Sequence, residues 1–193
     1  MDLDRAKAAI GGALRQRPDR PVLVCVDGHS AAGKSTVADV LATEFGAAVV
    51  AGDGFYRVMS EPDRAALAPS EGADRYYDWR RMDTEALAPL SVGVVATYHP
   101  YEWATGELSR DTCTVEPAPV VIVEGLFVSR PELRHRYAVK ILVEADGDRR
   151  RQRQIARADA TDEWLQRWDA AERHHLTVVS PARCFDVIVD SSA

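Results

Sequence analysis

Apolar residues recur along this chain in two patterns, one with helical spacing and one continuous. Leu3, Ala6, Ile10 and Leu14 lie three or four positions apart, which predicts an amphipathic helix near the start of the chain. Residues 120–123 form an unbroken run of β-branched side chains, typical of a strand that is covered on both faces. The chain therefore has the pattern of an α/β protein with a parallel sheet between helices.

The same reasoning divides the whole chain into elements. Five buried strands are expected, at residues 22–27, 47–51, 120–124, 138–143 and 186–189. After the first helix, which Pro18 and Pro21 end, further helices are expected over 35–45, from Asp83 as N-cap to Leu90, and over 148–157 and 162–176. Residues 60–72 are rich in proline and small side chains and predict a loop. Residues 94–98 and 113–115 are expected to flank a hairpin-like excursion.

Three chemically distinctive segments lie at the ends of predicted strands. They are the glycine-rich turn after the first strand, Asp53 after the second and Glu124 at the end of the third. Right-handed crossovers place the carboxyl ends of parallel strands at one edge of the sheet, where ligands of such sheets bind. We therefore expect these three segments to meet in one cleft.

The glycine-rich turn has the P-loop pattern G-x-x-x-x-G-K-S, at residues 28–35. A buried strand delivers this turn to the start of a helix, where backbone N–H groups bind phosphate. Lys34 would neutralise the outer phosphates and the Ser35 hydroxyl would bind Mg²⁺. The sequence thus predicts ATP and Mg²⁺ as cofactors and a nucleotide site formed by Gly28, His29, Ser30, Ala31, Ala32, Gly33, Lys34, Ser35 and Thr36.

Composition limits the setting of this site. The 193 residues suit a single domain over 1–193, and the net charge of −6 argues against a nucleic-acid-binding surface. No segment has the length and apolarity of a membrane span or a signal core, so a cytoplasmic protein is expected. Cys25, Cys113 and Cys184 predict neither a disulfide framework nor a zinc site, and Cys25 is expected to be buried. A homo-oligomer remains open.

The five histidines lack the spacing of metal ligands relative to acidic partners. His29 is expected to point outward, and His99, His135, His174 and His175 are expected at the surface or at helix ends. They predict no permanent metal site.

A P-loop serves switches, motors, transporters and kinases, so the class must come from other residues. None of the three lysines has an aspartate two positions later, which argues against the K-x-D motif of guanine-specific switches. A small-molecule phosphotransferase remains, in which the acceptor hydroxyl needs a base. Asp53, a carboxylate at a strand end, is the candidate for that base. The residues that follow it, Phe55, Tyr56 and Arg57, favour this role over that of a turn aspartate between two glycines. A nucleotide-binding module without turnover is the alternative from another class, and Asp53 argues against it.

Two further segments give a family resemblance. Residues 52–60, G-D-G-F-Y-R-V-M-S, resemble the D-x-F-Y-R segment of uridine/cytidine kinases, and residues 121–126, V-I-V-E-G-L, resemble the V-I-V-E-G-I strand of that family. The wider group contains phosphoribulokinase and pantothenate kinase. The resemblance implies a P-loop kinase fold: a five-stranded parallel sheet with helices on both faces and a small arginine-bearing lid, here at about residues 149–162.

The resemblance also implies roles for individual residues. Glu124 would hold a magnesium-bound water, and Arg153 and Arg157 of the lid would act on the transferred phosphate. The acceptor pocket would contain Asp53, Tyr56, Tyr77, Asp78, Tyr101 and Trp103, with Asp78 binding ribose hydroxyls.

The acceptor expected from this resemblance is a nucleoside. In the family a base-reading histidine follows the segment that matches residues 101–103, whereas residues 104–110 here contain none. Uridine and cytidine are therefore not expected to be strongly preferred, and a sugar, pantothenate-like or antibiotic alcohol is the alternative acceptor.

Overall fold

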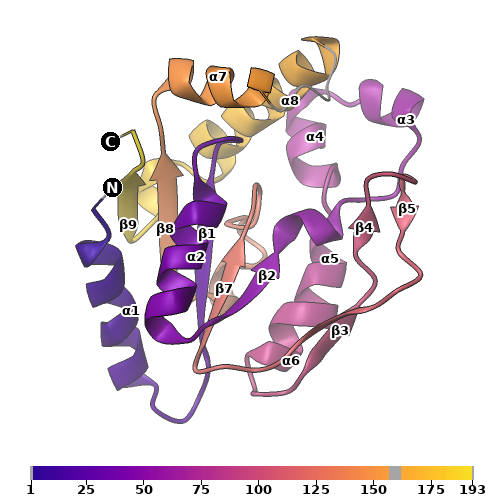
Figure 1. The fold of residues 1–193 in the computed structure, drawn as a ribbon. Helices are drawn as coiled ribbons and strands as arrows, with labels where there is room; N and C mark the ends of the chain where they lie inside the picture. The colour runs from indigo at the N-terminus through magenta and orange to yellow at the C-terminus, as the bar shows by residue number, and fades with distance from the viewer. Residues whose placement is uncertain (1, 157–161, 193) are drawn as a thin grey trace.

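The computed structural model describes residues 2–156 and 162–192. Its centre is a five-stranded sheet in which all neighbouring strands are parallel, in the order β2-β7-β1-β8-β9 (Figure 1). The strands are β1 (Val22–Gly28), β2 (Ala48–Ala51), β7 (Val120–Glu124), β8 (Val139–Glu144) and β9 (Val187–Asp190). The predicted fold class and the five strands are confirmed.

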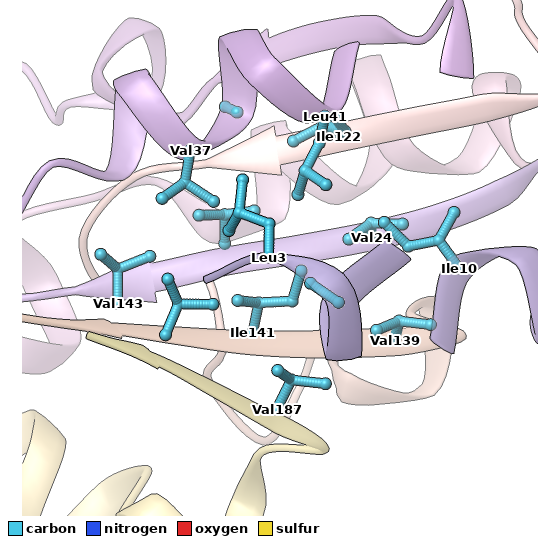
Figure 2. Close-up of a cluster of buried hydrophobic side chains, with 14 of the residues drawn as sticks. Leu3, Ile10, Val24, Val37, Leu41, Ile122, Val139, Ile141, Val143 and Val187 are labelled. Carbon is cyan, nitrogen blue, oxygen red and sulfur yellow. The ribbon is translucent and has the colours of Figure 1, made fainter. Parts of the chain in front are cut away.

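Alternate residues of the central strand enter two separate cores. Val24 of β1 belongs to the core between the sheet and the helices α1 (Asp4–Gln16) and α2 (Lys34–Phe45), where it packs with Ile10 and Leu41 (Figure 2). Leu23 belongs to the core on the opposite face. Because both faces are covered, every residue of β1 is buried. This explains why residues 22–26 are all apolar.

The opposite face of the sheet is covered by one irregular helical stretch. It comprises α5 (Trp79–Arg81), a π-helical segment (Met82–Leu87) and α6 (Ala88–Leu90), and it contributes Met82, Leu87 and Leu90 to the core. The predicted N-cap is wrong: the helix begins after Asp78, whose carboxylate accepts the N–H of Arg81 at 3.3 Å. Asp83 instead accepts the Nε–H of Arg136 at 2.8 Å.

The expectation of a loop over residues 60–72 is also wrong. This stretch forms α3 (Glu61–Ala65), and α4 (Pro69–Arg75) begins within it. The two prolines lie in the first turns of these helices, where an N–H has no intrahelical partner, so proline costs little there. The Ser60 hydroxyl accepts the N–H of Asp63 at 3.2 Å and completes the start of α3.

The remaining elements are short or lie beyond the carboxyl edge of the sheet. The predicted excursion is a pair of nested antiparallel ladders, with outer strands β3 (Ala96–Tyr98) and β6 (Cys113–Val115) and inner strands β4 (Tyr101–Glu102) and β5 (Glu107–Leu108). The last helices are α7 (Gly147–Ala156) and α8 (Asp162–His174), followed by a π-helical turn at His175–Val179. Short 3₁₀ turns lie at Gly52–Phe55, Arg134–Arg136 and Ala182–Cys184.

Within the described ranges, no helix combines the length and apolarity needed to cross a membrane. Cys25 is fully buried in β1, as predicted.

Candidate active site

The loop between β1 and α2 is held close to its neighbouring strand. A Cβ on Gly28 would lie 2.2 Å from the carbonyl oxygen of Val143 in β8, so no other residue fits there. Gly33 has φ +93° and is the N-cap of α2. Lys34 folds back across the loop, and its Nζ donates to the carbonyl oxygens of Gly28 and His29, each at 3.0 Å. The start of α2 and the loop together make a phosphate-binding turn.

The segments that carry Asp53 and Glu124 lie side by side. Ala51 pairs with Glu124 in the register of β2 and β7. Immediately beyond this pair the two backbones nearly touch, since a Cβ on Gly125 would lie 3.1 Å from the Cα of Gly52. The carboxyl ends of three parallel strands thus bring the P-loop, Asp53 and Glu124 to one edge, as expected.

Ser35 and Glu124 form the pair expected to bind metal. The Ser35 Oγ donates to the Oε2 of Glu124 at 3.3 Å. Burial raises the pKa of the Glu124 carboxyl, Lys34 lowers it, and Asp53 raises it further. Among the described residues no cluster of three or more His, Cys, Asp or Glu could hold an ion alone. A hydroxyl and one carboxylate fit Mg²⁺, which usually keeps several waters and phosphate oxygens as its other ligands.

Asp53 is hydrogen-bonded to a buried tyrosine. The Tyr77 hydroxyl donates to the Oδ1 of Asp53 at 2.7 Å. An isolated antiparallel β-bridge between Tyr56 and Tyr77 joins the segment after β2 to the segment before α5. This backbone pairing holds the Tyr77 side chain near Asp53. Burial, followed by the charge of Asp53, raises the pKa of Tyr77 well above its ordinary value. The phenol therefore stays protonated and acts as a donor.

These groups surround a cavity of about 230 Å³. Its polar wall comes from the P-loop and the strand ends: Ser30, Ala31, Gly33, Lys34, Ser35, Thr36, Asp53, Glu124 and Gly125. Its other wall is mainly aromatic: Tyr77, Trp103, Leu126, Trp164 and Trp168. Of the predicted acceptor residues, Asp53, Tyr77 and Trp103 line this cavity, and no other of the predicted set is among its described lining residues.

The other predicted acceptor residues lie behind or beside this wall. The Tyr56 ring stacks on Trp103 with centroids 4.6 Å apart, and Tyr101 meets both rings edge to face. The Asp78 carboxylate caps α5, with an Nη2 of Arg57 3.9 Å from its Oδ1. The contacts of Tyr56 and Tyr101 with Trp103 support the aromatic wall. A direct role of Tyr56, Tyr101 and Asp78 in acceptor binding stays a prediction.

One predicted lid arginine reaches the P-loop. The Nη1 of Arg153, on α7, donates to the carbonyl oxygen of Ala31 at 3.0 Å. Arg157 lies outside the described residues, so its predicted role stays a prediction.

Two aromatic residues of the cavity were not predicted. Trp164 and Trp168 both come from α8, and their rings stack with centroids 5.0 Å apart. Their spacing of four places them on one face of the helix, and Glu172 follows at the same spacing. That pattern was the available signal, although it does not indicate which surface the face covers.

Two histidines have buried carboxylate partners that the sequence did not indicate. His175 is buried, and its Nε2 lies 3.0 Å from the Oδ2 of Asp27. Burial alone would raise the pKa of Asp27, but His175 and hydrogen bonds from Ser129 lower it below its ordinary value. His29 does not point simply outward, because its Nδ1 contacts the Oε2 of Glu172 at 3.0 Å. In both cases a carboxylate distant in sequence provides the partner.

Comparison with known proteins gives the same assignment at the level of the family. The model of the phosphoribulokinase/uridine kinase family matches residues 23–163. A uridine kinase of Chloroflexus aggregans is 31% identical over 184 residues, covering 87% of this chain and 86% of the relative. A uridine kinase of Deinococcus deserti is 30% identical over 182 residues, covering 88% and 87%.

A similar fold occurs among solved structures. A structure described as a "putative fructose transport system kinase" from Silicibacter sp. has a TM-score of 0.74 at 22% identity, covering 97% of this chain and 98% of that one. At this identity the likeness concerns the fold alone.

Proposed function

The chain belongs to the phosphoribulokinase/uridine kinase family and is an ATP-dependent kinase, and from this premise we propose that it phosphorylates the 5′-hydroxyl of a nucleoside. The observation that carries the proposal is the placement of Asp53. Its carboxylate lines the same cavity as Lys34 of the P-loop and Glu124 of β7. A base, a phosphate-binding cation and a metal-binding carboxylate at one cavity are the groups that phosphoryl transfer to an alcohol requires.

The P-loop and its neighbours are assigned to the donor. The backbone N–H groups at the start of α2 and the Lys34 ammonium would hold the phosphates of ATP. Ser35 and Glu124 would hold Mg²⁺, the latter through water. When bound, Mg²⁺ would neutralise charge on the transferred phosphate. Arg153, whose Nη1 lies 3.0 Å from the carbonyl oxygen of Ala31 in the loop, is assigned to the same phosphates.

Asp53 is assigned to the acceptor hydroxyl. Tyr77 binds its Oδ1, and we assign Oδ2 to the hydroxyl that attacks the γ-phosphate. The tyrosine fixes the rotation of the carboxylate, so that Oδ2 has a defined direction. As the bond between the acceptor oxygen and the γ-phosphorus forms, the bond from that phosphorus to the β–γ bridging oxygen breaks and ADP leaves. The hydroxyl proton passes to Oδ2.

The aromatic wall supports an acceptor with a flat ring. Trp103 and Trp164 line the cavity together with Asp53, and we assign their rings to stacking on the acceptor, which tolerates different rings. The uridine kinases among the relatives favour a nucleoside as the molecule that carries this ring.

A kinase for a non-nucleoside alcohol is the second candidate. It is favoured by the position of Asp78, the proposed diol-binding residue, which is not among the described residues that line the cavity. A sugar, pantothenate-like or antibiotic acceptor would use the same donor site and Asp53. A module that only binds nucleotide would not need Asp53 at this position.

A coupled assay of ADP release over a panel of acceptors tests the proposal. Nucleosides, free sugars, pantothenate and aminoglycosides are each tested with Mg·ATP, and Asp53→Asn is the matched control. The proposal expects nucleoside-dependent ADP release that this control lacks. Release with sugars or other alcohols alone would support the second candidate, whereas no stimulation by any alcohol would contradict both.

A further inference from the structure

Helix α8 contacts the first half of the P-loop through a buried carboxylate. The Glu172 side chain is fully buried. Its Oε2 accepts the backbone N–H of Ser30 at 3.1 Å, and its Oε1 accepts the Ser30 hydroxyl. One acidic side chain of α8 thus binds both donors of a single P-loop residue.

A second residue of α8 completes this contact. The Trp168 Nε1 donates to the Ser30 Oγ at 3.0 Å. The Ser30 hydroxyl therefore accepts from Trp168 while it donates to Glu172, and its orientation is fixed from both sides. Trp168 and Ser30 also line the cavity. A hydrogen bond therefore joins the aromatic wall to the phosphate-binding loop.

A carboxylate at the position of Glu172 does not by itself favour phosphate binding. A P-loop binds anions, and a buried carboxylate next to it repels phosphate through a medium that screens poorly. A buried charge is also costly unless its hydrogen bonds are satisfied. Hydrogen bonds from Ser30 and the 3.0 Å contact with the Nδ1 of His29 explain how the carboxylate is tolerated. They indicate that its contribution is to the shape of the loop.

We propose that Glu172 and Trp168 are positioning residues that hold Ser30 and preform the first half of the P-loop before nucleotide binds. The inference rests on the proposed function only in requiring that this loop binds the phosphates of ATP. Because Trp164 and Trp168 belong to the same helix, α8 then places both its part of the aromatic wall and the phosphate-binding loop.

Two substitutions of Glu172 separate positioning from charge. Glu172→Ala removes both acceptors of Ser30, so the loop must be ordered when nucleotide binds. Glu172→Gln keeps an oxygen for the Ser30 N–H and presents an amide N–H to the Ser30 Oγ, while the repulsive charge is lost. Calorimetric titration with Mg·AMP-PNP, well below the melting temperature of each variant, is expected to show at least about 10-fold weaker binding for Glu172→Ala. Glu172→Gln is expected to bind as tightly as the wild type or more tightly.

A double-mutant cycle tests the contact of Trp168 with Ser30. Trp168→Phe keeps an aromatic ring between Tyr76 and Trp164 but loses the indole N–H. Its effect on the Kd of Mg·AMP-PNP should be largely absent in a Ser30→Ala background, because the shared bond is already missing. Trp164→Phe, one turn away in the same stack, is the matched control and should combine additively with Ser30→Ala.

The outcomes distinguish this inference from the proposed function, since no acceptor is used. A wild-type protein that fails to bind Mg·AMP-PNP would overturn both. Wild-type binding with an unchanged Kd in folded Glu172→Ala would overturn the positioning role alone, as would equal weakening in Glu172→Gln and Glu172→Ala. Additive effects of Trp168→Phe and Ser30→Ala would remove Trp168 from the proposal.

Discussion

At the scale of single residues, Asp53 and Tyr77 are the pair on which the proposed chemistry depends. The 2.7 Å hydrogen bond between them leaves the carboxylate anchored at one oxygen. Neither residue is part of the P-loop, so substitutions here should separate transfer from nucleotide binding.

Asp53→Asn is expected to lower kcat by about 10²–10⁴-fold, because the amide keeps the size of the side chain but cannot take the proton. The Kd of Mg·ATP should change little. Steady-state kinetics and calorimetry on the same preparation check both parts. If ATP affinity collapsed while kcat at saturation persisted, Asp53 would be a residue of the metal site or the fold.

Glu124 gives a prediction with a defined sign in pH. Burial raises the pKa of this carboxyl above 4.5, so the folded protein binds the proton more tightly than the unfolded chain does. Its contribution to stability is therefore fully present below about pH 4.5 and is lost as pH rises through the raised pKa. At pH 7.5 the ionised Glu124 should destabilise the metal-free protein.

Glu124→Gln is accordingly expected to raise the Tm of the metal-free protein at pH 7.5 by about 1–4 °C, and to require more Mg²⁺ for half-maximal rate. Differential scanning calorimetry in EDTA and a Mg²⁺ titration of the rate measure the two effects. The gain in Tm should shrink towards pH 5. A lower Tm for Glu124→Gln at pH 7.5 would contradict the assignment of Glu124 as a buried, metal-dependent charge.

At the scale of elements, helix starts account for the errors over residues 60–90. Pro62 and Pro69 favour a loop on local sequence, yet each lies in a first helical turn. Aspartate is a favourable N-cap residue, which makes Asp83 a candidate, but the N-cap of the helix is Asp78. Proline and aspartate are favourable both at helix starts and in loops, so local sequence alone does not decide between them.

Asp78 is predicted to have two tasks, one for each oxygen. Its Oδ1 caps α5, and the proposal leaves Oδ2 for a ribose hydroxyl. Asp78→Ala should lose the cap, at a cost of about 1 kcal/mol, and lower the Tm by about 2–4 °C. It should also erase the preference for a ribonucleoside over its 2′-deoxy analogue, expected to be about 5- to 150-fold in kcat/KM.

Asp78→Asn is the matched control for stability, because asparagine caps helices about as well as aspartate does. It should retain the Tm and still reduce the ribose preference. Thermal melts and paired kcat/KM measurements decide the matter. Full ribose discrimination in Asp78→Asn would make Asp78 a helix cap alone.

At the scale of the whole molecule, the parallel sheet and its carboxyl edge could be predicted because they depend on local patterns. The unbroken run of β7 and the glycines of the P-loop each specify their own backbone, and topology then brings Asp53 and Glu124 together. The contacts of Glu172 with Ser30 and of His175 with Asp27 join residues 142 and 148 positions apart. No local pattern predicts such pairs. The sequence therefore does not indicate that Trp164 and Trp168 of α8 line the cavity.

Identification of the reaction product tests the central claim most directly. Wild-type protein and Asp53→Asn are incubated with Mg·ATP and each of several nucleosides, and products are resolved by mass spectrometry and ³¹P NMR. We predict a nucleoside 5′-monophosphate in amounts equal to the ADP formed, with at least about 100-fold less from Asp53→Asn. Absence of a phosphomonoester from the wild-type reactions with every nucleoside, despite bound ATP, would contradict the account.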